Sequence, residues 1–153
     1  MRGRIDDLPA KAGDGYAAMS SLEVFLAGSG VPKNLQHLVK LRVSQINGCA
    51  FCVDMHSKHA RQGGETDARL FGVSAWRESP HFTSAERAAL DLAESGTRLA
   101  DNPHGVPDEV FEEAREEFDE STLTALVMLI AAINAWNRIS VINRTVPGSH
   151  TPR

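Results

Sequence analysis

Two cysteines three residues apart are the part of this sequence best suited to chemistry. Cys49 and Cys52 are the only cysteines among 153 residues, Asn47-Gly48 stands directly ahead of them, and His56 follows. If Asn47-Gly48 ends one helix and the next begins near Cys49, both sulfur atoms lie in a first helical turn. There, backbone N–H groups and the helix dipole stabilise a thiolate, which is the reactive form of cysteine. The spacing therefore predicts a reactive dithiol.

His56 adds a base to this pair. Helix positions three apart share a face, with Cβ atoms roughly 5–6 Å apart, slightly wider than a disulfide prefers, so a modest distortion of the first turn lets the bond close. His56 lies four residues beyond Cys52, on the same face and within reach as a proton acceptor. A nearby imidazole raises the thiolate fraction near neutral pH. Together, the three residues predict a pair that cycles between dithiol and disulfide.

Composition and charge limit the partners of the chain. Hydrophobic residues make up 42% and charged residues 24%, which is ordinary globular usage, and the net charge of −4 leaves no basic stripe for nucleic acid. The longest apolar run, Leu123 to Ile133, is shorter than the about 20 residues that span a membrane, and the charged start lacks a signal-peptide pattern. We therefore predict a cytoplasmic protein with no nucleic-acid and no membrane partner. In that compartment a close cysteine pair is more often redox-active or metal-binding than structural.

Helical spacing dominates the chain and predicts an all-α fold. Apolar residues recur at helical intervals up to the break at Asn47-Gly48, and no strand pattern of useful length appears in the sequence. The expected segments are about 35–46, 49–62, 66–71, a helix opened by a capping box at Thr83–Glu86, one with Pro107 in its first turn, and a long one with Ser121 as N-cap. This last helix is apolar around most of its circumference, so we expect its burial by the core or by a neighbouring subunit.

These signals together describe one domain. We predict a single-domain bundle of about six to seven helices over residues 1–153, with a core at about 15–147. The ends, 1–14 and 148–153, are predicted to be loosely held.

Two other interpretations of the cysteines remain open. Free cysteines are often buried as small apolar residues, although the coincidence with Asn47-Gly48 and His56 argues against this. Metal binding is the second: Cys49, Cys52, His56 and His59 extend over roughly 15 Å of helix, too far for one tetrahedral ion. A zinc ion would take two or three of them and a ligand from elsewhere, such as His37. Because one helix cannot close this ligand set on a single ion, we expect no metal. Phosphate-loop and dinucleotide fingerprints are missing from the sequence, so we expect no cofactor.

A longer stretch of sequence resembles a known family. The segment Leu38–His56, LVKLRVSQINGCAFCVDMH, is similar to the core motif of alkylhydroperoxidase D-like proteins in the carboxymuconolactone decarboxylase family. Phe82–Leu90 (FTSAERAAL) and Ile133–Ile139 (INAWNRI) resemble the later helices of that family, so the likeness covers about residues 15–147. It implies an all-helical fold that assembles into trimers, hexamers or larger rings, and a thiol peroxidase mechanism.

The resemblance also implies a role for each candidate catalytic residue. Cys52 attacks the peroxide and becomes a sulfenic acid, Cys49 resolves it to a disulfide, and His56 belongs to a proton relay. The relay of the best-known members includes a glutamate twelve residues before the first cysteine, and His37 occupies that position here. A carboxylate would orient His56 and stabilise its cation better than a second imidazole does.

From these residues we predict an antioxidant oxidoreductase that reduces hydroperoxides, is recharged by a dithiol reductant or redox protein, and acts as a homo-oligomer. Its catalytic residues would be Cys52, Cys49, His56 and His37. The alternative, motivated by His37, is a non-catalytic redox-sensing or metal-binding helical oligomer. Lactone decarboxylation ranks lowest, because the decarboxylase branch of the family generally lacks the cysteine pair.

Overall fold

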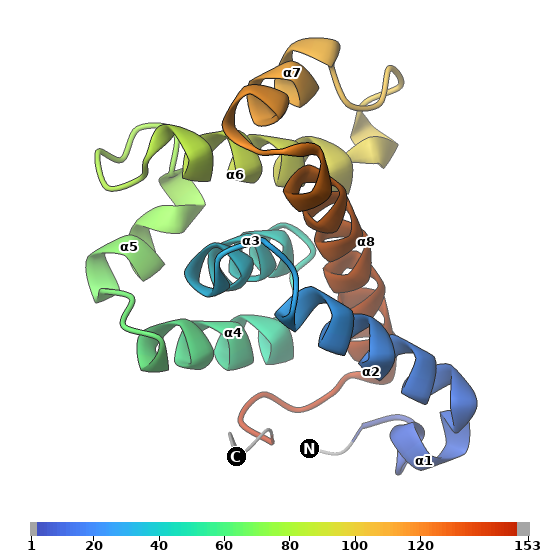
Figure 1. Cartoon of the computed structure of the whole chain (residues 1–153). Helices are drawn as coiled ribbons and strands as arrows, with labels where there is room; N and C mark the ends of the chain where they lie inside the picture. The colour runs from blue at the N-terminus through green and yellow to red at the C-terminus, as the bar shows by residue number, and fades with distance from the viewer. Residues whose placement is uncertain (1–2, 150–153) are drawn as a thin grey trace.

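Every regular element within residues 3–149, the range that the computed structural model describes, is helical. The α-helices are α1 (Leu8–Ala12), α2 (Asp14–Ala27), α3 (Lys33–Ile46), α4 (Ala50–Gln62), α5 (Asp67–Gly72), α6 (Ser84–Thr97), α7 (Asp108–Glu117) and α8 (Glu120–Asn143) (Figure 1). Short 3-10 helices follow α5 at Val73–Ala75 and α6 at Leu99–Asp101. The all-α prediction is confirmed. The described range holds eight α-helices rather than six to seven, since the N-terminal region contributes α1 and α2.

The N-terminal segment is held more firmly than the sequence predicted. Its backbone reaches the end of α8, where Arg4 N donates to the carbonyl of Asn143 and Ile5 N donates to Asn143 Oδ1, both at 2.7 Å. The sequence could not predict this contact, because Asn143 is so distant in the chain. At the other end, Gly148 N donates to Asp54 Oδ2 at 3.0 Å. Residues 1–2 and 150–153 of the two predicted loose ends lie outside the described range.

The predicted helix boundaries depend on local signals, and most of them hold. Ile46 ends α3, and Gly48 takes a left-handed conformation (φ 66°) that suits glycine, so the chain turns sharply into α4. Thr83 opens α6 with both hydrogen bonds of a capping box. The predicted N-cap of α8 was wrong by two residues. Asp119, and not Ser121, caps the helix, because its carboxylate accepts from Thr122 N at 2.7 Å.

Helix α3 occupies the centre of the fold, with α4, α6 and α8 packed around it (Figure 1). One face of α3 joins a core cluster that also includes Leu26 of α2 and Leu126 and Leu129 of α8. The opposite face, with Leu38 and Leu41, joins a second cluster with Trp76 and residues of α4 to α6. Burial on these sides fixes α3, and therefore fixes the turn at its end that leads into α4.

Helix α8 is the apolar helix that the sequence singled out. Among the described helices it is the one long and apolar enough, by length and composition alone, to cross a membrane. The central helix of a globular core has the same properties, and α8 buries residues against α2, α3 and α6. We interpret α8 as a core helix. The cytoplasmic location and the absence of a membrane partner stay predictions.

Candidate functional site

Cys49 and Cys52 form a disulfide at the beginning of α4, with Cα atoms 5.3 Å apart. Cys49 is the N-cap of α4: its Sγ accepts from Cys52 N at 3.3 Å, and its own N–H donates to Ser44 O at 2.9 Å. The pair thus closes as the three-residue spacing allowed. Each cysteine is only 1% exposed, so a reagent must reach the sulfur atoms through a cavity instead of the outer surface.

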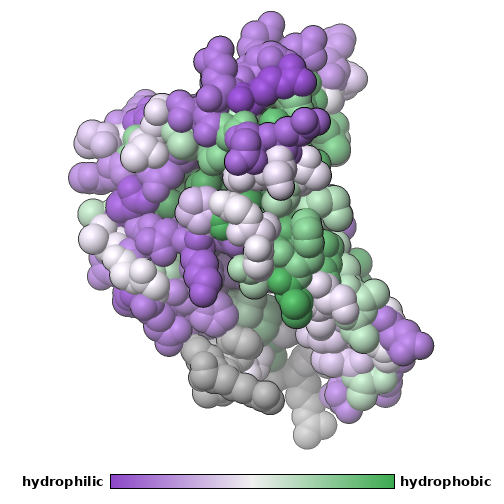
Figure 2. All heavy atoms as spheres, in the orientation of Figure 1, coloured by the Kyte–Doolittle hydropathy of each residue, from purple (hydrophilic) through white to green (hydrophobic). Residues whose placement is uncertain are grey.

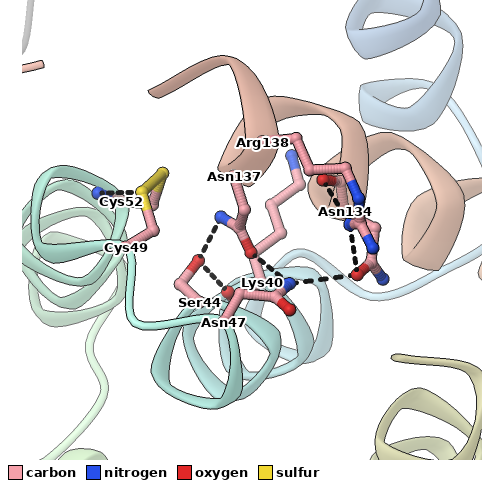
Figure 3. Close-up of a disulfide and its surroundings, with 8 residues drawn as sticks. All are labelled: Lys40, Ser44, Asn47, Cys49, Cys52, Asn134, Asn137 and Arg138. Carbon is pink, nitrogen blue, oxygen red and sulfur yellow. Dashed lines mark hydrogen bonds between the residues drawn. A yellow bond between two sulfur atoms is a disulfide. The ribbon is translucent and has the colours of Figure 1, made fainter. Parts of the chain in front are cut away.

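A network of hydrogen bonds from α8 fixes the turn that carries Cys49 (Figure 3). Asn47 Nδ2 donates to Asn134 Oδ1 at 3.0 Å and to Asn137 Oδ1 at 2.9 Å. Asn137 Nδ2 donates to Ser44 Oγ at 3.0 Å, and the Ser44 hydroxyl donates to Lys40 O at 2.7 Å. The amides of α8 therefore hold both α3 and the α3–α4 turn, and buried polar groups joined in this way specify one geometry.

Sequence reasoning missed this network, although a signal for it was present. Asn134 and Asn137 stand three apart on an otherwise apolar helix, and such residues share one face. Asn137 is 1% exposed, so its amide requires buried hydrogen-bonding partners. Two amides on an apolar helix face therefore indicate a polar contact with another element, but not which element.

Next to the disulfide lies a cavity of about 590 Å³ between the N-terminal segment, α2, α3, α4 and α8. Cys52, His56 and His37 line it, whereas Cys49 is not among its described lining residues. Much of the remaining wall is apolar or aromatic, with Ile5, Leu8, Tyr16, Phe51, Met55, Trp136, Ile139 and Val146. The structure thus brings three of the four predicted catalytic residues to one cavity, and of the two cysteines it is Cys52 that lines it.

Three histidines meet on one side of this cavity. His37 comes from α3, and His56 and His59 come from α4; one ring nitrogen from each lies within 4.8 Å of the other two. Burial, followed by the charges of Lys40 and His59, lowers the pKa of His37, so this imidazole favours its neutral form. His59, which the sequence offered as a candidate metal ligand, also lines the cavity.

The cavity also contains a carboxylate that sequence analysis did not identify. Glu23 of α2 lines the wall, where it pairs with Lys40 Nζ at 2.5 Å and accepts from Trp136 Nε1 at 3.0 Å. Asp54 instead pairs with Lys58 at 2.8 Å, and its position two residues before His56 puts it on a different face of α4. Glu23 was missed because α2 carries no chemical motif, and only the packing of α2 against α8 brings it here.

The motif and the fold together define a family. The family model for carboxymuconolactone decarboxylases matches residues 10–95, more than half of the chain, and the chain belongs to this family. The uncharacterized protein YdfG of Bacillus subtilis is 42% identical over 130 residues, which cover 85% of this chain and 87% of YdfG. The uncharacterized protein YnjA of Escherichia coli is 38% identical over 107 residues, and these span only 57% of YnjA.

Solved structures agree with this assignment. ATU0492 from Agrobacterium tumefaciens, described as a protein of unknown function and a candidate antioxidant defence protein AhpD, has a TM-score of 0.88 at 39% identity, covering 97% of this chain and all of ATU0492. The debrominase Bmp8 has a TM-score of 0.77 at 20% identity, covering 92% of this chain and 74% of Bmp8, which supports the fold alone. The predicted alkylhydroperoxidase D-like relationship is confirmed.

Proposed function

We propose that this protein is a thiol peroxidase that reduces hydroperoxides through Cys52 and Cys49. The observation that carries the proposal is the disulfide whose Cys52 forms part of a cavity wall together with His56. A nucleophilic thiol needs access to substrate, a nearby base and a partner thiol within bonding distance. Cys52 has all three, whereas Cys49 lies behind it at the N-cap of α4.

The disulfide corresponds to the oxidised intermediate of the catalytic cycle, before the reductant acts. In the reduced protein, the Cys52 thiolate would attack one peroxide oxygen, the O–O bond would break, and the alcohol would leave with a proton supplied through His56. Cys52 is then a sulfenic acid. The Cys49 thiol attacks the Cys52 sulfur, a water molecule leaves, and the disulfide forms. A dithiol reductant or redox protein restores both thiols by exchange, so each turnover converts a hydroperoxide and a dithiol into an alcohol, water and a disulfide.

His56 and His37 would carry the proton transfers. His56 is buried on the face of α4 that also presents Cys52, and His37 faces the same cavity from α3. The lowered pKa of His37 keeps it neutral near pH 7, and a neutral imidazole has one nitrogen that accepts and one that donates a proton. His37 can therefore pass a proton, but it supplies no negative charge to stabilise a His56 cation.

The cavity favours an organic hydroperoxide over hydrogen peroxide. Its volume of about 590 Å³ falls within the range of pockets that bind small organic molecules, and aromatic and aliphatic side chains line much of it. Hydrogen peroxide would leave most of this apolar wall in contact with water. An alkyl or aryl group on the peroxide would bury that surface, so we expect faster reaction with cumene hydroperoxide than with hydrogen peroxide.

Stopped-flow kinetics of the reduced protein tests the proposal. Loss of thiol would be followed with both peroxides, and the Cys49–Cys52 state would be determined by mass spectrometry. Cys52→Ser should abolish the reaction, whereas its matched control, Cys49→Ser, should consume one equivalent of peroxide and leave a sulfenic acid that dimedone traps. A Cys52→Ser variant that still consumed peroxide at the wild-type rate would exclude Cys52 as the nucleophile.

We also propose that the chain assembles with copies of itself, as the family resemblance implied. Figure 2 shows hydrophobic surface where the end of α2 lies against α8. Val24 and Phe25 of α2 are 74% and 54% exposed, and Val127 and Met128 of α8 are also exposed. Apolar side chains gathered on a surface in this way are typical of contacts between subunits.

A further inference from the structure

The three histidines of the cavity have a geometry that the peroxidase proposal does not require. A peroxidase relay needs His56 and at most one further group, yet His59 brings a third imidazole to the same point. The rings of His37 and His59 have centroids 5.9 Å apart, those of His56 and His59 6.4 Å apart, and one nitrogen of each residue lies within 4.8 Å of the others. Neither of these two ring pairs is stacked face to face, since the ring planes are inclined by 60° and 71°.

This convergence follows from the packing of two helices. His56 and His59 are three residues apart on α4 and so share one face of that helix. His37 is presented by α3, which packs closely along α4 and is held by the core on its other sides. Two ligands from one helix and a third from its neighbour make a fixed, three-sided arrangement, which a single helix cannot provide.

From this arrangement we infer that His37, His56 and His59 form a binding site for one divalent transition-metal ion, with Zn²⁺ as the ion best suited to it. Imidazole nitrogen is a preferred ligand of zinc, copper, iron and nickel, and three protein ligands with an open fourth position form a common zinc arrangement. Zinc–nitrogen bonds of 2.0–2.1 Å place tetrahedral ligand atoms about 3.4 Å apart. The observed 4.8 Å limit closes to this value by small side-chain rotations, which the broad χ2 torsion of histidine permits.

Charged groups of both signs lie around the three imidazoles. Lys40 is the cation that lines the same cavity, and Glu23 pairs with it at 2.5 Å. Glu65 is a further carboxylate near enough to His37 to interact with its charge. The cavity is open to solvent at its mouth and leaves space for a water molecule as the fourth ligand.

The sequence left open which two or three of Cys49, Cys52, His56 and His59 would join His37 at a metal ion, and the structure selects the imidazoles. In the structure both sulfur atoms are in the disulfide, so neither is available as a thiolate ligand, whereas the three imidazoles converge in the same state. The inference therefore goes beyond the peroxidase proposal and does not depend on it. Zinc binding should be a property of the oxidised protein.

Isothermal titration of the oxidised, tag-free full chain with Zn²⁺ tests the site, and the visible absorption of Co²⁺ gives a second readout of coordination. We expect one ion per chain. His37→Ala and His59→Ala should each weaken zinc binding by at least about tenfold, since loss even of a residue that only orients a ligand costs 10–100-fold in affinity. His104→Ala, which removes an exposed loop histidine, is the matched control and should bind like wild type.

Three results would overturn the inference: no saturable zinc binding, equal binding by wild type and both cavity variants, or loss of binding in a Cys49→Ser/Cys52→Ser double variant. Circular dichroism and thermal unfolding verify that each variant is folded, and His59→Gln replaces His59→Ala if the alanine variant does not fold. The oxidised protein has no thiol to react with peroxide. Failure of zinc binding therefore leaves the peroxidase proposal intact, and a failed peroxidase assay leaves the metal site intact.

Discussion

Replacing Asn137 with alanine should destabilise the protein substantially, although this residue touches neither sulfur atom. Asn137 is fully buried on α8 and makes two side-chain hydrogen bonds, one to Ser44 and one from Asn47. Each such bond contributes about 1 kcal/mol to the free energy of unfolding. The partners keep other bonds, since the Ser44 hydroxyl still donates to Lys40 O and the Asn47 amide still donates to Asn134, so no group is left wholly unsatisfied.

The space left by the amide adds about 1 kcal/mol, as other cavity-forming substitutions do. The free energy of unfolding should therefore fall by about 3 kcal/mol for Asn137→Ala. For a chain of this length, that loss corresponds to a melting temperature lower by about 6–12 °C. Because the two hydrogen bonds do not involve sulfur, the loss should appear in the oxidised and in the reduced protein alike.

Urea unfolding monitored by circular dichroism, in both redox states, measures this change. Arg138→Ala is the matched control on the same helix: Arg138 is exposed and, within residues 3–149, its side-chain hydrogen bonds go to Asn134, so the free energy of unfolding should change by less than about 0.5 kcal/mol. A loss below about 1 kcal/mol for Asn137→Ala, or an equal loss for Arg138→Ala, would refute the idea that the amide network holds the α3–α4 turn.

Three further predictions address the relay, the pH dependence of stability and the assembly. His37→Glu should raise the rate of the reduced protein with peroxide at pH 7, because a carboxylate stabilises a His56 cation; a stopped-flow rate that is unchanged or lower contradicts this. Burial opposes ionisation of Glu86, but hydrogen bonds, chiefly from Arg69, outweigh it and lower the pKa of Glu86. The ionised carboxylate therefore stabilises the folded protein at any pH above the ordinary carboxyl pKa, and this stabilisation is lost as the pH falls through the lowered pKa. Between pH 7 and pH 3 the melting temperature of the Glu86→Gln variant should therefore fall by less than that of the wild type. The control variant Glu112→Gln, at an exposed position, should show the same fall as the wild type. Val24 is 74% exposed, so Val24→Lys should leave the melting temperature of the subunit unchanged but lower the molecular mass measured by light scattering toward that of the monomer. A wild-type protein that is monomeric at micromolar concentration would rule out the assembly.

The sequence alone predicted the elements whose signals are local. The helical spacing up to Asn47-Gly48, the helix end at that dipeptide and the capping box at Thr83 each involve residues within one or two turns, and each appears in the structure where it was expected. The same holds for the disulfide, because three residues of helix place Cys49 and Cys52 close enough to bond. The family also followed from the sequence, since the motif up to His56 is contiguous.

Only the tertiary structure decided which side chains surround the cysteines. Glu23 of α2 lines the cavity beside Cys52, and Asn137 of α8 holds the turn that carries Cys49; both placements depend on how these helices pack. Packing depends on the burial of apolar faces. The sequence around the polar residues therefore does not show which of them the packing brings together. The attachment of Arg4 and Ile5 to Asn143 has the same cause. A linear motif can thus specify a reactive pair, whereas the cavity, its third imidazole and its carboxylate exist only after the chain has folded.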